Sequence, residues 1–467
     1  MIFSSIPFLY YFLPCVLLVY FLMPGRGKNA VLLLFSLVFY AWGEPKYVLV
    51  MLLSILLGYV FGLLMEKNRE NPRRKQACLV FSVIGSLAFL FYFKYADFFI
   101  ANFNAVTGLS LPLLKIALPI GISFYTFQIL SYTVDVYRGQ VKAQRNFVDL
   151  AAYVALFPQL IAGPIVRYSD IAAELQTRTH SYDKAADGIR RFVMGLSKKI
   201  LFANVLGELC EGFRQSSDRS VLFFWLYAVA YTLHIYFDFS GYSDMAIGLG
   251  RIFGFSFPEN FNYPYISGSI TEFWRRWHMS LGSWFRDYVY IPLGGNRVSR
   301  RRHFFNIAVV WMLTGFWHGA AWNFLFWGLY FSVILILEKA FLLQWLKKRK
   351  CVGHLYVLLL VVVSFVIFDA KDMPSAFSCI QAMFGGGGYP LVSVEGLYSL
   401  RSYGFVLLLA AVGATPVPRN LVRKLRDAAR WDTAWALGES ALYIGLVILC
   451  TAYLVDGSFN PFLYFRF

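Results

Sequence analysis

The chain has 467 residues, of which 58% are hydrophobic, 19% are aromatic and only 15% are charged. A soluble protein needs roughly a quarter of its residues charged to cover its surface. This composition therefore excludes an ordinary soluble fold and favours an all-α polytopic membrane protein, in which helices satisfy their own backbone groups. The net charge of +17 does not indicate a nucleic-acid partner, because the basic residues form short clusters between apolar runs, as cytoplasmic loops of membrane proteins do.

Apolar runs of about 20 residues predict membrane-spanning helices. In chain order, the clear runs are 6–23, 29–43, 46–65, 76–94, 112–136, 221–239, 304–319, 321–342, 354–370, 403–418 and 438–455. Three weaker runs are 147–163, 190–208 and 240–256. The sequence has no internal repeat and no Gly/Ser-rich or Pro-rich linker. We therefore expect a single transmembrane domain over residues 1–467, ending in an aromatic tail at about 456–467.

The basic clusters predict the topology. They lie between the apolar runs, at 26–28, 67–75, 138–145, 297–302, 347–350 and 419–430. Short loops rich in Lys and Arg remain in the cytoplasm. Placing every cluster there predicts that both termini lie outside, and hence that the chain crosses the membrane an even number of times.

One segment, residues 255–303, fits no simple span. It contains Pro258 and Pro264, followed by a stretch over 271–281 in which aromatic and cationic residues alternate too closely for a lipid-facing helix. We expect Thr271 to cap a helix there. Irregular backbone at membrane depth is tolerated only where protein buries it, so the segment predicts a re-entrant or horizontal helix packed against the rest of the protein.

The six cysteines are scattered, mostly within apolar segments. They form no CxxC pair and no His/Cys cluster with the spacing of metal ligands. We therefore expect no disulfide framework, no metal site and no bound cofactor.

Two histidines are candidates for chemistry. His318 lies at or near the turn between two strongly apolar runs, and an ionisable group at membrane depth is costly enough to suggest a function. The alternative is a neutral, structural histidine that is hydrogen bonded to a carbonyl or a tyrosine. His278 lies 40 residues upstream in the expected buried helix. Imidazole accepts protons near neutral pH, but His278 taken alone is better explained as a helix-packing or interfacial histidine beside Arg275 and Arg276.

Two carboxylates follow the apolar run 221–239. Asp238 and Asp244 enclose a segment with Gly241 between them. We expect them to form ion pairs with Arg275 or Arg276 and so to hold the buried segment in place. This structural role is favoured over a direct role in catalysis.

Five motifs occur in order along the chain: Gln159–Ile165 (QLIAGPI), Asp238–Asp244 (DFSGYSD), Trp274–Leu281 (WRRWHMSL), Tyr288–Arg297 (YVYIPLGGNR) and Trp317–Gly319 (WHG). With these motifs the sequence resembles the membrane-bound O-acyltransferases over essentially its whole length. The PLGGNR string and the YFRF tail resemble the bacterial polysaccharide branch of that family. That branch includes alginate and peptidoglycan O-acetyltransferases, and the teichoic-acid D-alanyl transfer protein is a more distant relative.

The resemblance implies a ring of tilted transmembrane helices around a central tunnel. His318 matches the invariant catalytic histidine, and His278 matches a second, more variable position at the narrowing of the tunnel. The residues that the resemblance and the motifs suggest as supporting or tunnel-lining are Asp238, Asp244, Trp274, Arg275, Arg276, Asn296, Arg297, Trp317 and Asn323. Asn296 and Arg297 are expected to line the donor entrance.

The resemblance also implies a reaction and its partners. A thioester donor, acetyl-CoA or an acyl carrier protein, is expected to approach from the cytoplasm. The acyl group, acetyl by analogy, leaves on the outer face and passes to an SGNH-type partner protein that modifies an extracellular polysaccharide. The chain would then lie in the lipid of a bacterial cytoplasmic membrane.

The tail offers a candidate acyl acceptor. A partner peptide in related D-alanylation systems ends in a similar aromatic motif whose tyrosine is proposed to receive the acyl group. By that resemblance the acceptor here is Tyr464, and the predicted topology places it outside. The alternative is an interfacial aromatic anchor.

Other functions remain open from sequence. A transporter or exporter of a glycan or lipid would use the histidines as proton relays, although such proteins often contain inverted repeats, which this sequence lacks. D-alanyl transfer to teichoic acid and acylation of a lipid or protein within the membrane also fit the shared motifs.

Overall fold

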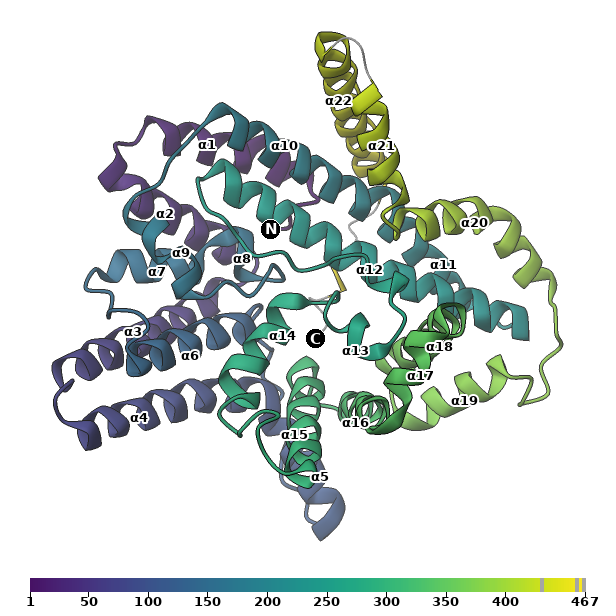
Figure 1. The fold of residues 1–467 in the computed structure, drawn as a ribbon, viewed down its shortest axis with the longest axis horizontal. Helices are drawn as coiled ribbons and strands as arrows, with labels where there is room; N and C mark the ends of the chain where they lie inside the picture. The colour runs from purple at the N-terminus through teal and green to yellow at the C-terminus, as the bar shows by residue number, and fades with distance from the viewer. Residues whose placement is uncertain (429–431, 458–461, 464–467) are drawn as a thin grey trace. The chain divides into compact units, whose positions relative to one another are not determined.

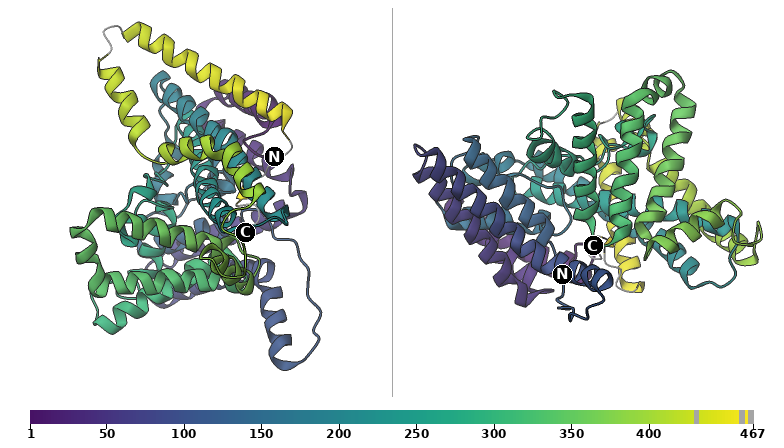
Figure 2. Two further views of the ribbon diagram at one scale, coloured as in Figure 1. Left: turned by 90° about the vertical axis from the view of Figure 1, so that its right-hand side faces the viewer. Right: turned by 90° about the horizontal axis from the view of Figure 1, so that it is seen from below.

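The structure is a computed structural model that describes residues 1–428, 432–457 and 462–463. All regular elements of this described part are helices (Figures 1 and 2), which confirms the predicted all-α class. Seven continuous helical stretches of this part, some of which join consecutive elements, are long and apolar enough to cross a membrane: Pro45–Lys67, Pro72–Thr107, Val221–Ile252, Trp322–Lys348, Lys350–Asp369, Val394–Gly413 and Asp432–Asp456. The chain is therefore a multi-pass membrane protein, and the orientation of its termini stays a prediction.

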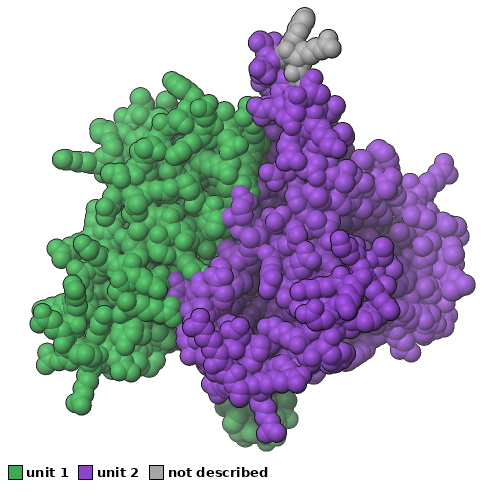
Figure 3. Space-filling view, in the orientation of Figure 1, with its two compact units in different colours: residues 1–192, 245–258, 464–466 green, residues 193–244, 259–463, 467 purple. Residues whose placement is uncertain are grey.

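The chain divides into two compact units (Figure 3). The first comprises residues Met1–Phe192 and Met245–Pro258. Its helices are α1 (Leu13–Leu22), α2 (Lys28–Ala41), α3 (Val48–Lys67), α4 (Pro72–Leu90), α5 (Ala96–Thr107), α6 (Ile122–Arg138), α7 (Phe147–Ala155), α8 (Phe157–Leu160), α9 (Tyr168–Gln176) and most of α10 (Tyr182–Ser197). Helices α3, α4 and α6 pack on one another. A single domain over the whole chain stays a prediction.

The second unit comprises the described residues of Val193–Asp244 and Glu259–Leu463. Its helices are α11 (Val205–Gln215), α12 (Val221–Ile252, in part), α13 (Ile270–Phe273), α14 (Met279–Phe285), α15 (Arg300–His318), α16 (Trp322–Leu337), α17 (Leu343–Lys348), α18 (Lys350–Asp369), α19 (Met373–Met383), α20 (Val394–Gly413), α21 (Val417–Ala428) and α22 (Asp432–Asp456). Its π-helical segments are η5 (Lys198–Asn204), η7 (Arg286–Tyr290) and η8 (Glu338–Leu342).

Most of the predicted spans correspond to helices. Those at 46–65, 76–94, 321–342, 354–370 and 438–455 are confirmed, and those at 221–239 and 240–256 are parts of one helix, α12. The span expected at 403–418 lies instead at Val394–Gly413. That helix begins earlier because the Ser393 hydroxyl accepts a hydrogen bond from the Gly396 amide and caps it.

Other predicted boundaries were wrong for local reasons. The run 112–136 becomes helical only at Ile122, because Pro112 and Pro119 lack the N–H that a helix interior needs. The run 147–163 is broken between α7 and α8 at Leu156, and 190–208 continues through α10, η5 and α11. The first run contains a shorter apolar helix, Phe8–Leu22. The runs 29–43 and 304–319 match helices α2 and α15, which are not among the seven long apolar helices.

Helices α15 and α16 form a closely packed hairpin within the second unit (Figure 1). Two glycines permit the approach: a Cβ at Gly315 would lie 2.2 Å from the Phe324 carbonyl oxygen, and one at Gly328 would lie 2.3 Å from that of Trp311. Small residues let helix backbones meet in membrane proteins. This contact fixes the end of α15, where His318 lies.

Substituting Gly328 with alanine is expected to destabilise the protein by about 1–3 kcal/mol, because the new methyl group meets backbone rather than a mobile side chain. The thermal unfolding midpoint of the purified protein in detergent should fall. Gly445→Ala on α22 is the control, because nothing lies within 4 Å of a Cβ built there. If both variants unfold at the parent's temperature, the proposed close packing of α15 and α16 is incorrect.

Candidate active site

His278 lies in a loop that the backbone of residues 260–262 supports. The Asn260 carbonyl accepts from the Met279 amide at 3.0 Å, and the Asn262 amide donates to the Arg276 carbonyl at 2.9 Å. His278 itself has a φ of +46°, in the left-handed region that side chains other than Gly and Asn rarely adopt. This loop therefore holds the histidine in a costly conformation at the start of α14.

The Asn260 side chain determines the tautomer of His278. Asn260 Oδ1 lies 3.1 Å from His278 Nδ1 and accepts from the Ser280 hydroxyl at 2.8 Å and the Ser280 amide at 3.3 Å. The Ser280 backbone amide can only donate a hydrogen bond, so the Asn260 side-chain atom that faces it is the oxygen Oδ1 and not the nitrogen. His278 Nδ1 therefore carries its proton, and Nε2 carries the lone pair. Asn260 Nδ2 donates in turn to Ser243 Oγ on α12 at 3.0 Å.

The surroundings of His278 favour its neutral form. The ring is buried, and the edge-on ring of Phe239 from α12 lies 4.7 Å away between centroids. Burial, followed by the electrostatic effect of nearby His318, lowers the pKa of His278 well below its ordinary value. The ring is therefore neutral at physiological pH, with a basic nitrogen at Nε2.

His318 is the last residue of α15 and is also buried. The preceding residue, Trp317, contacts both histidines: its ring centroid lies 6.1 Å from that of His278 and 5.0 Å from that of His318. Trp327 of α16 and Phe368 of α18 meet the His318 ring edge-on at 5.2 Å and 5.3 Å. The structure thus brings three predicted residues together in one aromatic, buried cluster.

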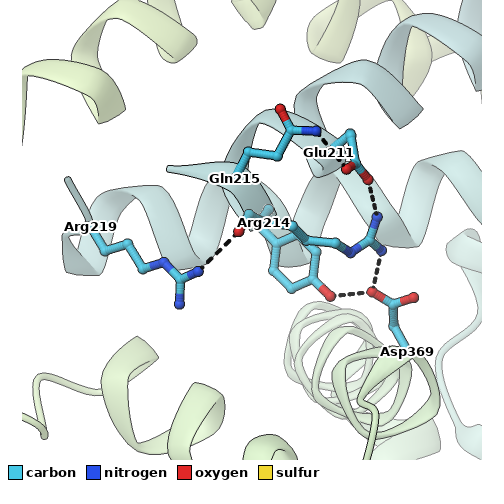
Figure 4. A network of polar contacts seen from close by, with 6 residues as sticks. Glu211, Arg214, Gln215, Arg219 and Asp369 are labelled. Atoms are coloured by element: carbon cyan, nitrogen blue, oxygen red, sulfur yellow. Dashed lines mark hydrogen bonds and ion pairs between the residues drawn. The ribbon is translucent and has the colours of Figure 1, made fainter. Parts of the chain in front are cut away.

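The turn after His318 is tied to the end of α18. Asn323 Nδ2 donates to the carbonyls of Phe368 and Ala370, at 3.4 Å and 3.0 Å. The residue between them, Asp369, accepts from Arg214 at 2.5 Å and from Tyr227 (Figure 4). Asn323 is therefore a structural link between α16 and α18, which positions the Phe368 ring against His318.

A buried carboxylate supports the segment that leads to His278. Glu338 of η8 is 1% exposed and accepts from the Ile270 amide at 2.6 Å, the Thr271 amide at 2.8 Å and the Thr271 hydroxyl at 2.6 Å. Two of these donors are amides in the first turn of α13, which have no acceptor within the helix itself. The predicted cap by Thr271 was wrong: Ser269 is the N-cap and accepts from the Glu272 amide. Two short helices, α13 and α14, stand where one was expected.

The predicted ion pairs of the DFSGYSD motif were also wrong. Asp238 pairs with Lys199 at 2.7 Å and Asp244 with Lys198 at 2.6 Å, whereas Arg276 pairs with Glu272. The reason lies at Gly241, where a Cβ would be only 3.2 Å from Lys198 Cβ and 3.3 Å from the Lys199 amide nitrogen. That close approach brings η5 against α12 between the two carboxylates.

The remaining predicted residues lie away from the histidines or in packing roles. Trp274 packs among Trp311, Trp327 and Phe331, and Arg275 is exposed. Asn296 and Arg297 are exposed in the loop before α15. Helix α15 has 19 residues and ends at His318, so its two ends lie about 27 Å apart at 1.5 Å per residue. The loop of Asn296 and Arg297 precedes the opposite end from His318.

Sequence reasoning missed Asn260, Lys199 and Glu338 as contributors. Glu338 had a usable signal, because it is an acidic residue within an apolar run and such residues are rarely without a role. Asn260 had none, since its importance depends on a contact across 18 residues. Within the described ranges, no group of three His, Cys, Asp or Glu side chains is arranged to hold a metal ion.

Comparison with known proteins identifies the family. The family model described as "MBOAT, membrane-bound O-acyltransferase family" matches residues 37–368. The chain is 39% identical to "Probable alginate O-acetylase AlgI" of Azotobacter vinelandii and 40% identical to that of Pseudomonas putida, each over the full length of both chains. It is 34% identical to "Peptidoglycan O-acetyltransferase" of Helicobacter pylori, over 84% of this chain and 81% of that protein. The chain belongs to the membrane-bound O-acyltransferase family.

Proposed function

We propose that this protein transfers an acetyl group from a cytoplasmic thioester to the outer face of the membrane, for O-acetylation of an extracellular polysaccharide. The observation that carries the proposal is that His278 and His318 are both buried and both contact Trp317, in a chain of this family. The family relationship favours this acyltransferase over an exporter. The similarity to proteins named for alginate and peptidoglycan acetylation favours a polysaccharide acceptor.

The proposed chemistry uses His318 as general base. It removes the proton from an attacking hydroxyl as the oxygen forms a bond to the thioester carbonyl carbon. The C–S bond then breaks, and the proton passes to the departing thiolate, giving an ester and a thiol. General base catalysis of this kind contributes about 10²–10⁴-fold to a rate. The central tunnel in which the reactants would meet stays a prediction.

His278 is proposed to orient a reactant. Because Nδ1–H donates to Asn260, neutral His278 offers an acceptor at Nε2 and can align a donor such as a hydroxyl. Polarising the thioester carbonyl, the other role expected for it, would require the protonated ring. The low pKa of His278 favours the first role.

The donor and the acceptor remain parts of the proposal. Acetyl-CoA and an acetylated carrier protein are the two candidate donors, and an SGNH-type partner outside the membrane is the proposed carrier to the polymer. Tyr464, the proposed first acceptor, lies outside the described residues. An experiment with purified protein and either donor, labelled in the acetyl group, tests the reaction: thiol release above the uncatalysed rate supports it, and its absence with both donors contradicts it.

Replacing Tyr464 with phenylalanine is expected to abolish covalent labelling of the chain, because the substitution removes only the hydroxyl oxygen that would form the ester. Labelling is measured by intact-mass spectrometry after incubation with the labelled thioester. Tyr453→Phe, on the exposed surface of α22, is the control and should label like the parent. Undiminished labelling of the Tyr464 variant would reduce the tail to an interfacial anchor.

A further inference from the structure

Two residues of the C-terminal segment are buried in the second unit. Phe462 and Leu463 are only 1% and 6% exposed. The Leu463 amide donates to Asp238 Oδ2 at 2.8 Å, and Lys199 Nζ lies 4.5 Å from the centre of the Phe462 ring. The Tyr242 ring meets the same Phe462 ring edge-on at 4.9 Å. These contacts give the two residues three kinds of partner: a hydrogen-bond acceptor, a cation and an aromatic ring.

The acceptor and the cation are themselves a fully buried ion pair. Asp238 Oδ1 binds Lys199 Nζ at 2.7 Å, and the two side chains are 1% and 0% exposed. A buried ion pair is stable only when its remaining hydrogen-bonding positions are satisfied as well. The Leu463 amide satisfies the second carboxylate oxygen, and the Phe462 ring covers the ammonium group. The pair therefore complements the C-terminal segment chemically.

The neighbouring ion pair shows that cover by the C-terminal segment is specific to Lys199 and Asp238. Lys198 and Asp244 lie on the same two elements and pair at 2.6 Å, but their side chains are 23% and 18% exposed. The one pair is partly open, while the other is covered by residues 462–463. This gives a matched control within the chain.

Helix α12 connects the tail contacts to the histidine loop. Asp238 and Tyr242, four residues apart, contact residues 462–463. Phe239 and Ser243, also four residues apart and one position further along, contact His278 and Asn260. Residues at i and i+4 lie on one face of a helix, so two adjacent faces of α12 hold the tail and the histidine loop.

We propose that Lys199, Asp238 and Tyr242 form an anchoring site for the chain's own C-terminal segment. The site holds Phe462 and Leu463 on the face of α12 that adjoins the face in contact with the histidine loop. This inference rests on the proposed function and deepens it. For Tyr464, the proposed acceptor, the anchor would act by holding the residue that precedes it in the chain. The anchor is a positioning device and takes no part in bond making.

The test measures protection of the tail in the full-length protein. Carboxypeptidase digestion in detergent, followed by intact-mass spectrometry, gives the rate at which Leu463 is lost. Asp238→Asn weakens the acceptor without changing its shape, and Phe462→Ala removes the ring while leaving the ion pair in place. Each is expected to raise the rate of Leu463 loss about tenfold, as weakening a hydrogen bond to a charged group allows. The double variant should gain little more than either single one, because both remove the same anchor.

Asp244→Asn is the control, since it makes the same change six residues along α12 and should digest like the parent. Equal rates for the parent, Asp238→Asn and Phe462→Ala would overturn the anchor, as would an equal acceleration by Asp244→Asn. Phe462→Ala keeps the test valid if Asp238→Asn fails to fold. Tyr464→Phe separates the two proposals: if it still carries out transfer while Asp238→Asn loses tail protection, the anchor stands and the acceptor role of Tyr464 falls.

Discussion

Replacing His318 with alanine is expected to lower the rate of acyl transfer about 10²–10⁴-fold, the contribution of a positioned general base. The ring lies at the end of α15 in contact with Trp317, Trp327 and Phe368, and alanine leaves no proton-accepting nitrogen at that position. The measurement is thiol release from a labelled acetyl thioester by purified protein.

His318→Gln is the companion variant, because it keeps a polar side chain of similar length and limits the cavity that alanine leaves. Both variants should have normal abundance in membranes if the effect is chemical. The control is His354→Gln. His354 lies near the start of α18, where its Nδ1 is 3.0 Å from the Ser267 carbonyl, whereas Phe368, which contacts His318, lies near the end of that helix. Parent-like turnover by both His318 variants would exclude His318 as the base.

Replacing Asn260 with leucine is the second change with a large expected effect. It removes the acceptor for His278 Nδ1 and for both donors of Ser280, and buried donors left without an acceptor cost about 1–3 kcal/mol each. The imidazole then loses the bond that fixes its tautomer. We expect turnover to fall about 100-fold, within the range of general acid–base effects, together with a lower unfolding temperature.

Asn260→Asp distinguishes positioning from simple packing. It retains an oxygen toward His278 and adds a negative charge, which favours the protonated ring and raises the pKa of His278 relative to the parent. If neutral His278 is the active form, the acidic limb of the kcat/KM profile should move to higher pH. Asn262→Leu is the control, because Asn262 pairs with Arg276 through its backbone. An unshifted profile in Asn260→Asp would show that His278 does not act in its neutral form.

Much of the fold was predictable because lipid imposes a simple requirement on the chain. Long apolar runs such as 46–65 and 354–370 are confirmed as helices, since an apolar segment of that length satisfies its own backbone groups only by becoming helical. The failures occurred where hydropathy carries no information on backbone geometry. Pro119 and Gly121 delay α6 within an apolar run, and α12 continues through Asp238 and Asp244 because Lys199 and Lys198 neutralise them.

The residue types of the candidate site were predictable from the sequence, but their contacts were not. His278, His318 and Trp317 were singled out from motifs and do meet in the structure. The partners of Asp238 could not be found in sequence, because a carboxylate can pair with any nearby cation and the chain offers 43. Distance decides that choice, and it depends on how η5 approaches α12 at Gly241.

The left-handed backbone of His278 has a consequence for how this position is constrained. Glycine adopts a φ near +46° without steric penalty, so considerations of folding alone would favour glycine at position 278. An imidazole there is held against that preference by the hydrogen bonds of its loop. Folding and the proposed chemistry thus make opposing demands on one residue position. A substitution there that improved thermal stability would remove the ring that we propose orients a reactant.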